Sequence, residues 1–135
     1  AVCDTVGTAG TLMGIAKALK KAKSNCKVVA VEPSSSPILS KGIKGSHNVE
    51  GVGLGFVPNI YDDKLVDNVI SIDESAARKI CKDLAKKEGI FCGTSSGMNV
   101  AAAIQISKEL GPKSRVVTVA CDTGLKYLSE GLFDD

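Results

Sequence analysis

The sequence predicts an α/β fold in which a mainly parallel sheet is flanked by helices. Apolar, strand-like segments alternate with segments whose apolar residues recur at helical spacing. Residues 1–32 run strand, helix, strand, which is the βαβ unit of a parallel sheet. The composition is 44% hydrophobic but only 4% aromatic. That balance suits an aliphatic core and does not suit a disordered chain or a nucleic-acid binder that works by stacking.

The first unit contains a short turn of small residues, and this turn is the leading candidate for a binding site. Residues 1–6 form a predicted strand, and a helix is expected from about Thr11. Between them lie Gly7, Thr8, Ala9 and Gly10. Small side chains let backbone N–H groups approach an anion, and a helix N-terminus adds the positive end of its dipole. The turn therefore predicts a phosphate cradle, with a plain strand-to-helix turn as the alternative.

The second predicted strand covers residues 27–32 and ends at Pro33. Residues 34–58 then hold many glycines and serines with no sustained apolar period. A loop of this length without elements of its own is often functional. It carries His47, the sole histidine, which has no Cys, His or carboxylate at metal-ligand spacing. We therefore expect a loop or surface histidine, and no metal site.

Further strands and helices follow in alternation. A third strand is expected over residues 66–72, with Asp73 or Ser75 capping a helix that ends at Gly89. A second small-residue turn, Gly93–Gly97, leads into a helix over residues 98–110, which Gly111 and Pro112 terminate. The last expected strand covers residues 115–121 and is followed by Asp122, Thr123 and Gly124.

Three of these turns are expected to meet. Ligands of open α/β sheets bind beyond the carboxyl ends of the strands. The turn at residues 7–11 and the turn at residues 122–124 both follow strands, and the turn at residues 93–97 precedes a helix. We therefore expect all three to line one crevice.

Charge and cysteine content exclude several function classes. The chain has 135 residues, and its net charge of +2 comes from 17 basic and 15 acidic residues that are interspersed. This pattern gives no electrostatic footprint for nucleic acid. Five cysteines without CxxC spacing do not form a secreted disulfide framework. We expect Cys3, Cys92 and Cys121 to be buried thiols. With no signal peptide or membrane-spanning run, the sequence favours a soluble, cytoplasmic protein.

A dinucleotide-binding domain is the first alternative. Glu32 ends the second strand, where the ribose-binding acid of such a domain belongs. The glycines, however, follow the pattern Gly7-x-x-Gly10-x-x-x-Gly14 rather than G-x-G-x-x-G. The threonines add hydroxyl donors that suit a terminal phosphate instead.

Four segments resemble motifs of the cysteine synthase (O-acetylserine sulfhydrylase) family, whose members are fold-type II pyridoxal-phosphate enzymes. Residues 7–11 (GTAGT) resemble its GTGGT phosphate loop, and residues 51–58 (GVGLGFVP) resemble GIGxGFIP. Residues 93–97 (GTSSG) resemble GISSG, and residues 121–129 (CDTGLKYLS) are similar to PDTGERYLS. The four occur in the family's order and cover nearly the whole chain. The resemblance implies part of the large domain of such an enzyme.

The resemblance implies a role for each motif. Gly7, Thr8, Ala9, Gly10 and Thr11 would hold the 5′-phosphate of pyridoxal 5′-phosphate. Ser95 would hydrogen-bond the pyridine nitrogen, although a plain helix N-cap is the alternative for this residue. A neutral hydroxyl there makes a weaker electron sink than a carboxylate would, which suits β-elimination and replacement. Gly51 and Gly53 would belong to a loop that closes on the bound substrate.

Two substitutions depart from the family pattern. Ala9 stands where the family has its middle glycine, which is tolerable only if this position does not need a positive φ. Cys121 stands in place of a proline, which leaves the backbone there freer.

The implied activity is PLP-dependent conversion of O-acetyl-L-serine and sulfide to L-cysteine and acetate. A cystathionine β-synthase-like or other β-replacing enzyme is one alternative, and a non-catalytic binding module is another. Residues 1–135 correspond to the C-terminal portion of the family. The chain opens inside a strand without an initial Met, so we expect an upstream segment that carries the Schiff-base lysine. No catalytic residue is assigned within this chain, and the complete enzyme is expected to be a homodimer.

Overall fold

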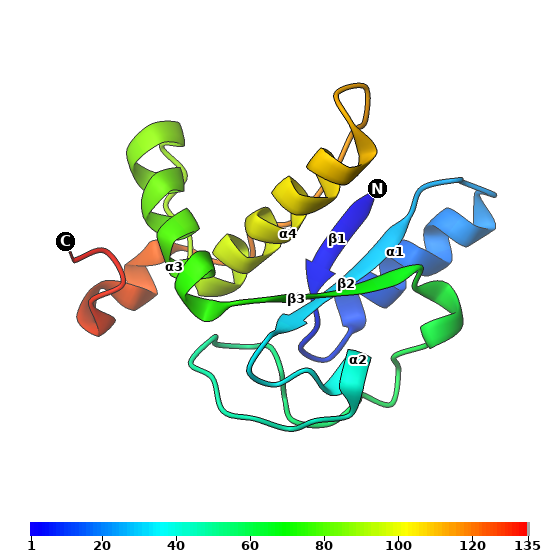
Figure 1. Cartoon of the computed structure of the whole chain (residues 1–135), viewed down its shortest axis with the longest axis horizontal. Helices are drawn as coiled ribbons and strands as arrows, with labels where there is room; N and C mark the ends of the chain where they lie inside the picture. The colour runs from blue at the N-terminus through cyan, green and yellow to red at the C-terminus, as the bar shows by residue number, and fades with distance from the viewer. Residues whose placement is uncertain (135) are drawn as a thin grey trace.

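The computed structural model describes residues 1–134, and a three-stranded parallel sheet forms its centre (Figure 1). The strands are β1 (Val2–Thr5), β2 (Val28–Pro33) and β3 (Asn68–Ile72), in the spatial order β1-β2-β3. Helix α1 (Gly10–Lys21) connects β1 to β2. The predicted βαβ unit and the α/β fold class are confirmed.

Each face of the sheet is covered by a different helix, because successive strand residues point to opposite faces. On one face, Val29 and Val31 belong to a cluster with side chains of α4 (Thr94–Leu110). On the other face, Val28 and Ala30 belong to a cluster with side chains of α1. Burial on both faces explains why β2 is apolar at nearly every position, as is usual in parallel sheets.

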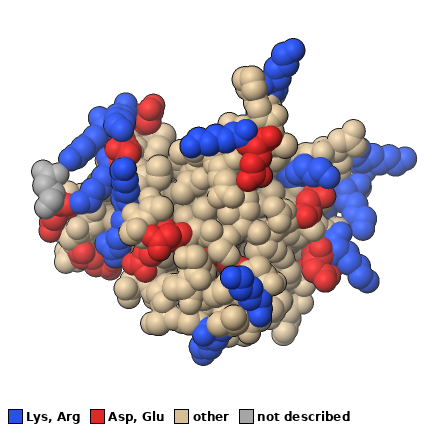
Figure 2. Space-filling model, in the orientation of Figure 1, with Lys and Arg blue, Asp and Glu red and all other residues tan. Residues whose placement is uncertain are grey.

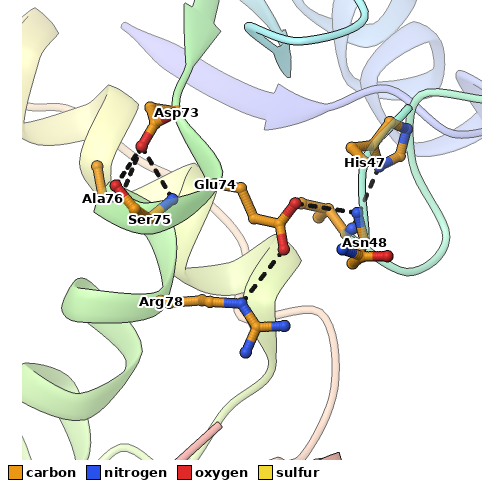
Figure 3. Close-up of polar contacts among 8 residues, drawn as sticks. His47, Asn48, Asp73, Glu74, Ser75, Ala76 and Arg78 are labelled. Atoms are coloured by element: carbon orange, nitrogen blue, oxygen red, sulfur yellow. Dashed lines mark hydrogen bonds and ion pairs between the residues drawn. The ribbon is translucent and has the colours of Figure 1, made fainter. Parts of the chain in front are cut away.

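The third helical segment is α3 (Glu74–Asp83), which continues through the π-helical turn η2 (Leu84–Glu88). The Asp73 carboxylate accepts hydrogen bonds from the backbone N–H groups of Ser75 and Ala76, so Asp73 is the N-cap (Figure 3). Gly89 ends the segment at φ 68°, a left-handed conformation that glycine adopts without strain. Both predicted ends of this helix are confirmed.

The expected strand at residues 115–121 is reduced to one bridge. Val117 pairs in parallel with Val2, its N–H donates to the Ala1 carbonyl at 2.9 Å, and its carbonyl accepts from the Cys3 N–H at 3.0 Å. Beyond this point side chains replace the ladder: the Thr118 hydroxyl donates to the Cys3 carbonyl at 2.8 Å. The predicted strand is therefore wrong in length, because its backbone groups find side-chain partners.

Two further expectations need correction. Helix α4 begins at Thr94 rather than at residue 98, so the small-residue turn 93–97 is the first turn of the helix itself. The loop of residues 34–58 contains the short helix α2 (Ile38–Lys41). Glu32 is only 2% exposed and accepts hydrogen bonds from the Leu39 N–H at 2.7 Å and the Ser71 hydroxyl at 3.1 Å. Glu32 thus fixes α2 to the sheet.

The remaining elements are 3-10 turns, η1 (Asp63–Leu65) and η3 (Gly124–Glu130). The C-terminal residues lie beside α3 (Figure 1), where Tyr127 and Leu132 pack with Cys81. Basic and acidic side chains are mixed over the face drawn in Figure 2, and no large area carries one sign alone. Among the described residues, no helix is both long and apolar enough to cross a membrane.

Burial of the cysteines was predicted in part. Cys3 and Cys92 are buried as expected, but Cys121 is exposed, since it lies past the end of the pairing with β1. Cys81 is buried although its burial was not predicted. Burial raises the pKa of the Cys81 thiol to about 12, which keeps it protonated and unreactive at neutral pH.

Candidate active site

The turn between β1 and α1 presents backbone donors without a side-chain cap. Ala9 is the N-cap of α1, and its side chain cannot accept a hydrogen bond. Within residues 1–134 the backbone N–H groups of Thr11 and Leu12 have no acceptor, and the Gly10 N–H reaches only the Thr8 hydroxyl, at 3.3 Å. These donors and the helix dipole favour an anion at this point. The cradle stays a prediction, and these free donors support it.

Ala9 adopts the left-handed conformation, with φ 70° and ψ 4°. From the sequence, an alanine was tolerable here only if the position did not need a positive φ. The observed φ is positive, so that condition is not met. The chain keeps the conformation despite an alanine penalty of about 1–2 kcal/mol, offset by a buried methyl group that joins the core under α1.

The loop at residues 49–55 packs directly on this turn. A Cβ placed on Gly7 would lie 2.1 Å from the Gly51 carbonyl oxygen, so only glycine fits there. The Gly53 N–H donates to the Val6 carbonyl at 3.0 Å. Gly51 and Gly53 both have positive φ, 75° and 58°. The two glycine motifs, more than forty residues apart in the sequence, therefore meet at one wall.

His47 holds this loop from within, as Figure 3 shows in part. Its Nδ1 accepts the Val49 N–H at 3.2 Å, so its Nε2 carries the hydrogen that is donated to the Gly53 carbonyl at 2.8 Å. His47 is therefore a half-buried loop residue, as predicted for a loop histidine. The neighbouring Asn48 N–H donates to Glu74 at 3.0 Å, and Glu74 also pairs with Arg78 of α3. These contacts fix the loop to the start of α3.

Ser95 lies in the first turn of α4 and is 5% exposed. Gly93 is the N-cap of this helix, so the alternative that Ser95 is only an N-cap is wrong. The adjacent Ser96 hydroxyl accepts the Cys121 N–H at 2.8 Å. This bond fixes the segment after Val117 beside the first turn of α4.

All three turns border one cavity of about 360 Å³, within the size range of small-molecule sites. Its lining includes all five cradle residues, the wall residue Gly51, and Ser95, Cys121 and Asp122. The prediction that the three turns meet is confirmed for these residues. Gly53 does not line the cavity. It holds the loop next to Gly51 through its hydrogen bond to Val6.

Four titratable lining residues were not assigned to the site from the sequence: Asp4, Glu50, Lys126 and Tyr127. Lys126 and Glu50 form an ion pair of 2.6 Å between η3 and the loop. The Tyr127 hydroxyl donates to Asp122 at 2.7 Å, and Asp122 also accepts the Gly93 N–H at 3.1 Å. Burial and the Asp122 charge raise the pKa of Tyr127, so its hydroxyl stays protonated. The sequence held one signal for Asp4. It is an acidic residue near the carboxyl end of the first predicted strand, where ligands of open α/β sheets bind.

The family model described as "pyridoxal-phosphate dependent enzyme" matches residues 1–122. The chain belongs to this family. A cysteine synthase of Staphylococcus aureus is 46% identical over 132 residues, which cover 96% of this chain and 43% of that protein.

Solved structures of family members have the same fold. The O-acetylserine sulfhydrylase isoform 3 of Entamoeba histolytica is 40% identical, with a TM-score of 0.90 over 99% of this chain and 41% of its own. The O-acetylserine-dependent cystathionine β-synthase of Helicobacter pylori is 33% identical, with a TM-score of 0.89 over 98% of this chain and 42% of its own. The chain thus spans less than half the length of the relatives it matches.

The residues that border the cavity fit the family's cofactor. Uncapped N–H groups and two threonine hydroxyls match the acceptor oxygens of a phosphate. The Ser95 hydroxyl, which lines the same cavity, suits a hydrogen bond to a ring nitrogen. Among residues 1–134, no group of three His, Cys, Asp or Glu side chains could hold a metal ion.

Proposed function

We propose that this chain forms the cofactor-binding part of a pyridoxal-phosphate-dependent enzyme that converts O-acetyl-L-serine and sulfide to L-cysteine and acetate. The observation that carries the proposal is the cavity itself. The uncapped N-terminus of α1, Ser95 of α4 and Gly51 of the loop at residues 49–55 all line it. The similarity to cysteine synthases over nearly the whole chain supports the substrate assignment.

Each residue has a binding or orienting task. The N–H groups of Gly10, Thr11 and Leu12 and the hydroxyls of Thr8 and Thr11 bind the phosphate. The Ser95 hydroxyl donates to the ring nitrogen, which leaves that nitrogen without a strong acid as its partner. Bound pyridoxal phosphate supplies the electron-accepting ring for β-elimination and replacement at an amino acid. The lysine that bonds the cofactor stays a prediction for an upstream segment, as do the homodimer and the cytoplasmic location.

Gly51 is proposed to face the substrate. Its carbonyl is turned toward Gly7. Its positive φ favours glycine, and glycine leaves the cavity wall without a side chain at this point. Gly53 behind it is held by both Val6 and His47. This arrangement allows the loop to narrow the cavity around a bound amino acid and exclude water while its base stays fixed.

Thr11→Val tests the cradle. The substitution keeps the β-branch and removes one exposed hydroxyl that lines the cavity. A charge-assisted hydrogen bond is worth about 1.5–3 kcal/mol, so affinity for pyridoxine 5′-phosphate falls by about 10- to 100-fold. This ligand has no aldehyde and cannot form lysine adducts. Isothermal titration calorimetry on the 135-residue chain measures the change.

Ser107→Ala is the matched control, since it removes an exposed hydroxyl from the far end of α4. The control keeps the affinity of the unsubstituted chain. Thr11→Val with unchanged affinity and a lowered melting temperature would assign Thr11 a purely structural role. Absence of pyridoxine 5′-phosphate binding by the unsubstituted chain would contradict the cradle as a whole.

A further inference from the structure

The cavity wall next to Gly7 contains one short exposed turn, residues 50–51. Val49 and Val52, on either side of it, are 3% and 7% exposed and belong to a core cluster with side chains of α4. Glu50 and Gly51 themselves are exposed and line the cavity. The two buried valines fix the ends of the turn, because moving either would expose apolar surface to water. The part of this wall that can move is therefore two residues long.

The backbone gives the 50–51 turn little support of its own. Within residues 1–134, neither the Glu50 N–H nor the Gly51 N–H has a hydrogen-bond acceptor. Gly51 has no side chain, and its φ of 75° lies in the left-handed region that glycine adopts without strain. Its carbonyl oxygen nevertheless lies close against Gly7. The side chain of Glu50 is therefore the one side chain of the turn that can hold Gly51 in this place.

Lys126 of η3 is the partner of that side chain. Its Nζ lies 2.6 Å from Glu50 Oε1, and the two side chains are 54% and 48% exposed. Among the described residues that line the cavity, Lys126 is the only basic one. The hydrogen bond to Glu50 raises the pKa of Lys126, and nearby carboxylates act in the same direction. Lys126 therefore stays charged at neutral pH, and the pair persists there.

The position of Lys126 is fixed by its neighbour in the chain. Tyr127 is 2% exposed, packs with Cys81, and donates its hydroxyl hydrogen to Asp122 at 2.7 Å. Asp122 also accepts the Gly93 N–H at the start of α4. These contacts hold η3 in place at Lys126. The ion pair thus connects a firmly held element to a turn that has no other side-chain partner.

We propose that Lys126 is a positioning residue for the cavity wall, whose ion pair with Glu50 holds Gly51 in place for the amino-acid part of the ligand. The inference rests on the proposed function, in which Gly51 faces the substrate. A wall that is already in place does not have to be ordered when the ligand binds, so less free energy is lost. Without the pair, the ligand must order the 50–51 turn itself. The effect falls on ligands that carry an amino-acid part.

Charge reversal tests the inference with two probes that share the phosphate and the ring. N-(5′-phosphopyridoxyl)-L-alanine carries an amino-acid part, pyridoxine 5′-phosphate does not, and neither has an aldehyde. Calorimetry on the 135-residue chain gives the ratio of their affinities. Lys126→Glu and Glu50→Lys each lower this ratio by about two- to fivefold, the range expected when an exposed ion pair is lost. The double variant restores the pair with its signs reversed, and the ratio returns to that of the unsubstituted chain.

Lys113→Glu is the matched control. Lys113 is exposed and lies beyond the last residue of α4, at the end of the helix opposite Ser95. This substitution changes the net charge as much as Lys126→Glu does and leaves the ratio unchanged. A second measurement needs no ligand. The ¹H–¹⁵N nuclear Overhauser effect of the Gly51 amide, which reports fast backbone motion, decreases in both single variants and recovers in the double variant.

The outcomes separate this inference from the proposed function. Opposite changes in the two single variants would show that the charges act directly on the ligand, and would overturn the inference. An unchanged ratio, or one that the double variant does not restore, overturns it as well. Each of these results leaves the cradle standing if Thr11→Val still weakens affinity. Absence of pyridoxine 5′-phosphate binding by the unsubstituted chain overturns both. Lys126→Gln and Glu50→Gln supply neutral variants if a charge-reversed one does not fold.

Discussion

Gly7 is the position where the two glycine motifs are in closest contact, and Gly7→Ala disrupts that contact. The added Cβ would lie 2.1 Å from the Gly51 carbonyl oxygen, more than 1 Å inside ordinary contact, and backbone cannot rotate away as a side chain can. The loop must shift. Steric overpacking costs about 1–3 kcal/mol, and each hydrogen bond lost from the loop adds about 1 kcal/mol.

Two hydrogen bonds at Gly53, from its N–H to Val6 and from His47 to its carbonyl, resist such a shift. We therefore expect Gly7→Ala to lower the free energy of unfolding by about 2–4 kcal/mol and to weaken pyridoxine 5′-phosphate binding. Urea denaturation followed by circular dichroism gives the first quantity, and calorimetry gives the second.

Gly14→Ala is the matched control. Gly14 is an exposed residue inside α1, and a Cβ there would meet nothing within 4 Å. This substitution raises stability by about 0.5–1 kcal/mol, because alanine favours a helix more than glycine does. If Gly7→Ala stayed within about 0.5 kcal/mol of the unsubstituted chain with unchanged affinity, the tight packing of the loop on the cradle would be refuted.

Two further predictions concern helix starts. Asp73→Ala removes the cap of α3 and lowers the melting temperature at pH 7. Hydrogen bonds from Ser75 and Ala76 lower the pKa of Asp73 in the folded chain, so its contribution is present above the ordinary carboxyl pKa and is lost as pH falls through the lowered one. If the melting temperatures of Asp73→Ala and the unsubstituted chain differed by as much at pH 2.5 as at pH 7, this pH dependence of the cap would be contradicted. Ala9→Gly relieves about 1–2 kcal/mol of backbone strain but loses a buried methyl group worth about 0.8 kcal/mol and gains unfolded-state entropy of about 0.4–1 kcal/mol. Stability should change by less than about 1 kcal/mol, and a larger loss in urea denaturation would show that the methyl contact dominates.

Local patterns determined much of this protein. The alternation of apolar strands with helical periods is enough to place β1, β2, β3, α1 and α3. Asp73 and Gly89 mark the ends of their helix through short-range hydrogen bonds and backbone preference. The turn at residues 7–11 could be proposed as a cradle from the sequence, because an anion site at a helix start depends only on adjacent residues.

Tertiary structure decided what depends on distant partners. The strand expected at residues 115–121 shortened to one bridge because Thr118, Ser96 and Asn99 supply side-chain hydrogen bonds in place of a ladder. The positive φ of Ala9 follows from the path of the chain into α1, which composition does not reveal. Asp4 lines the cavity, and its side chain is held by Asn99, ninety-five positions away, a contact that the sequence pattern does not reveal. Sequence patterns encode contacts a few residues apart, whereas the direction of a buried polar side chain is set by whichever segment folds against it.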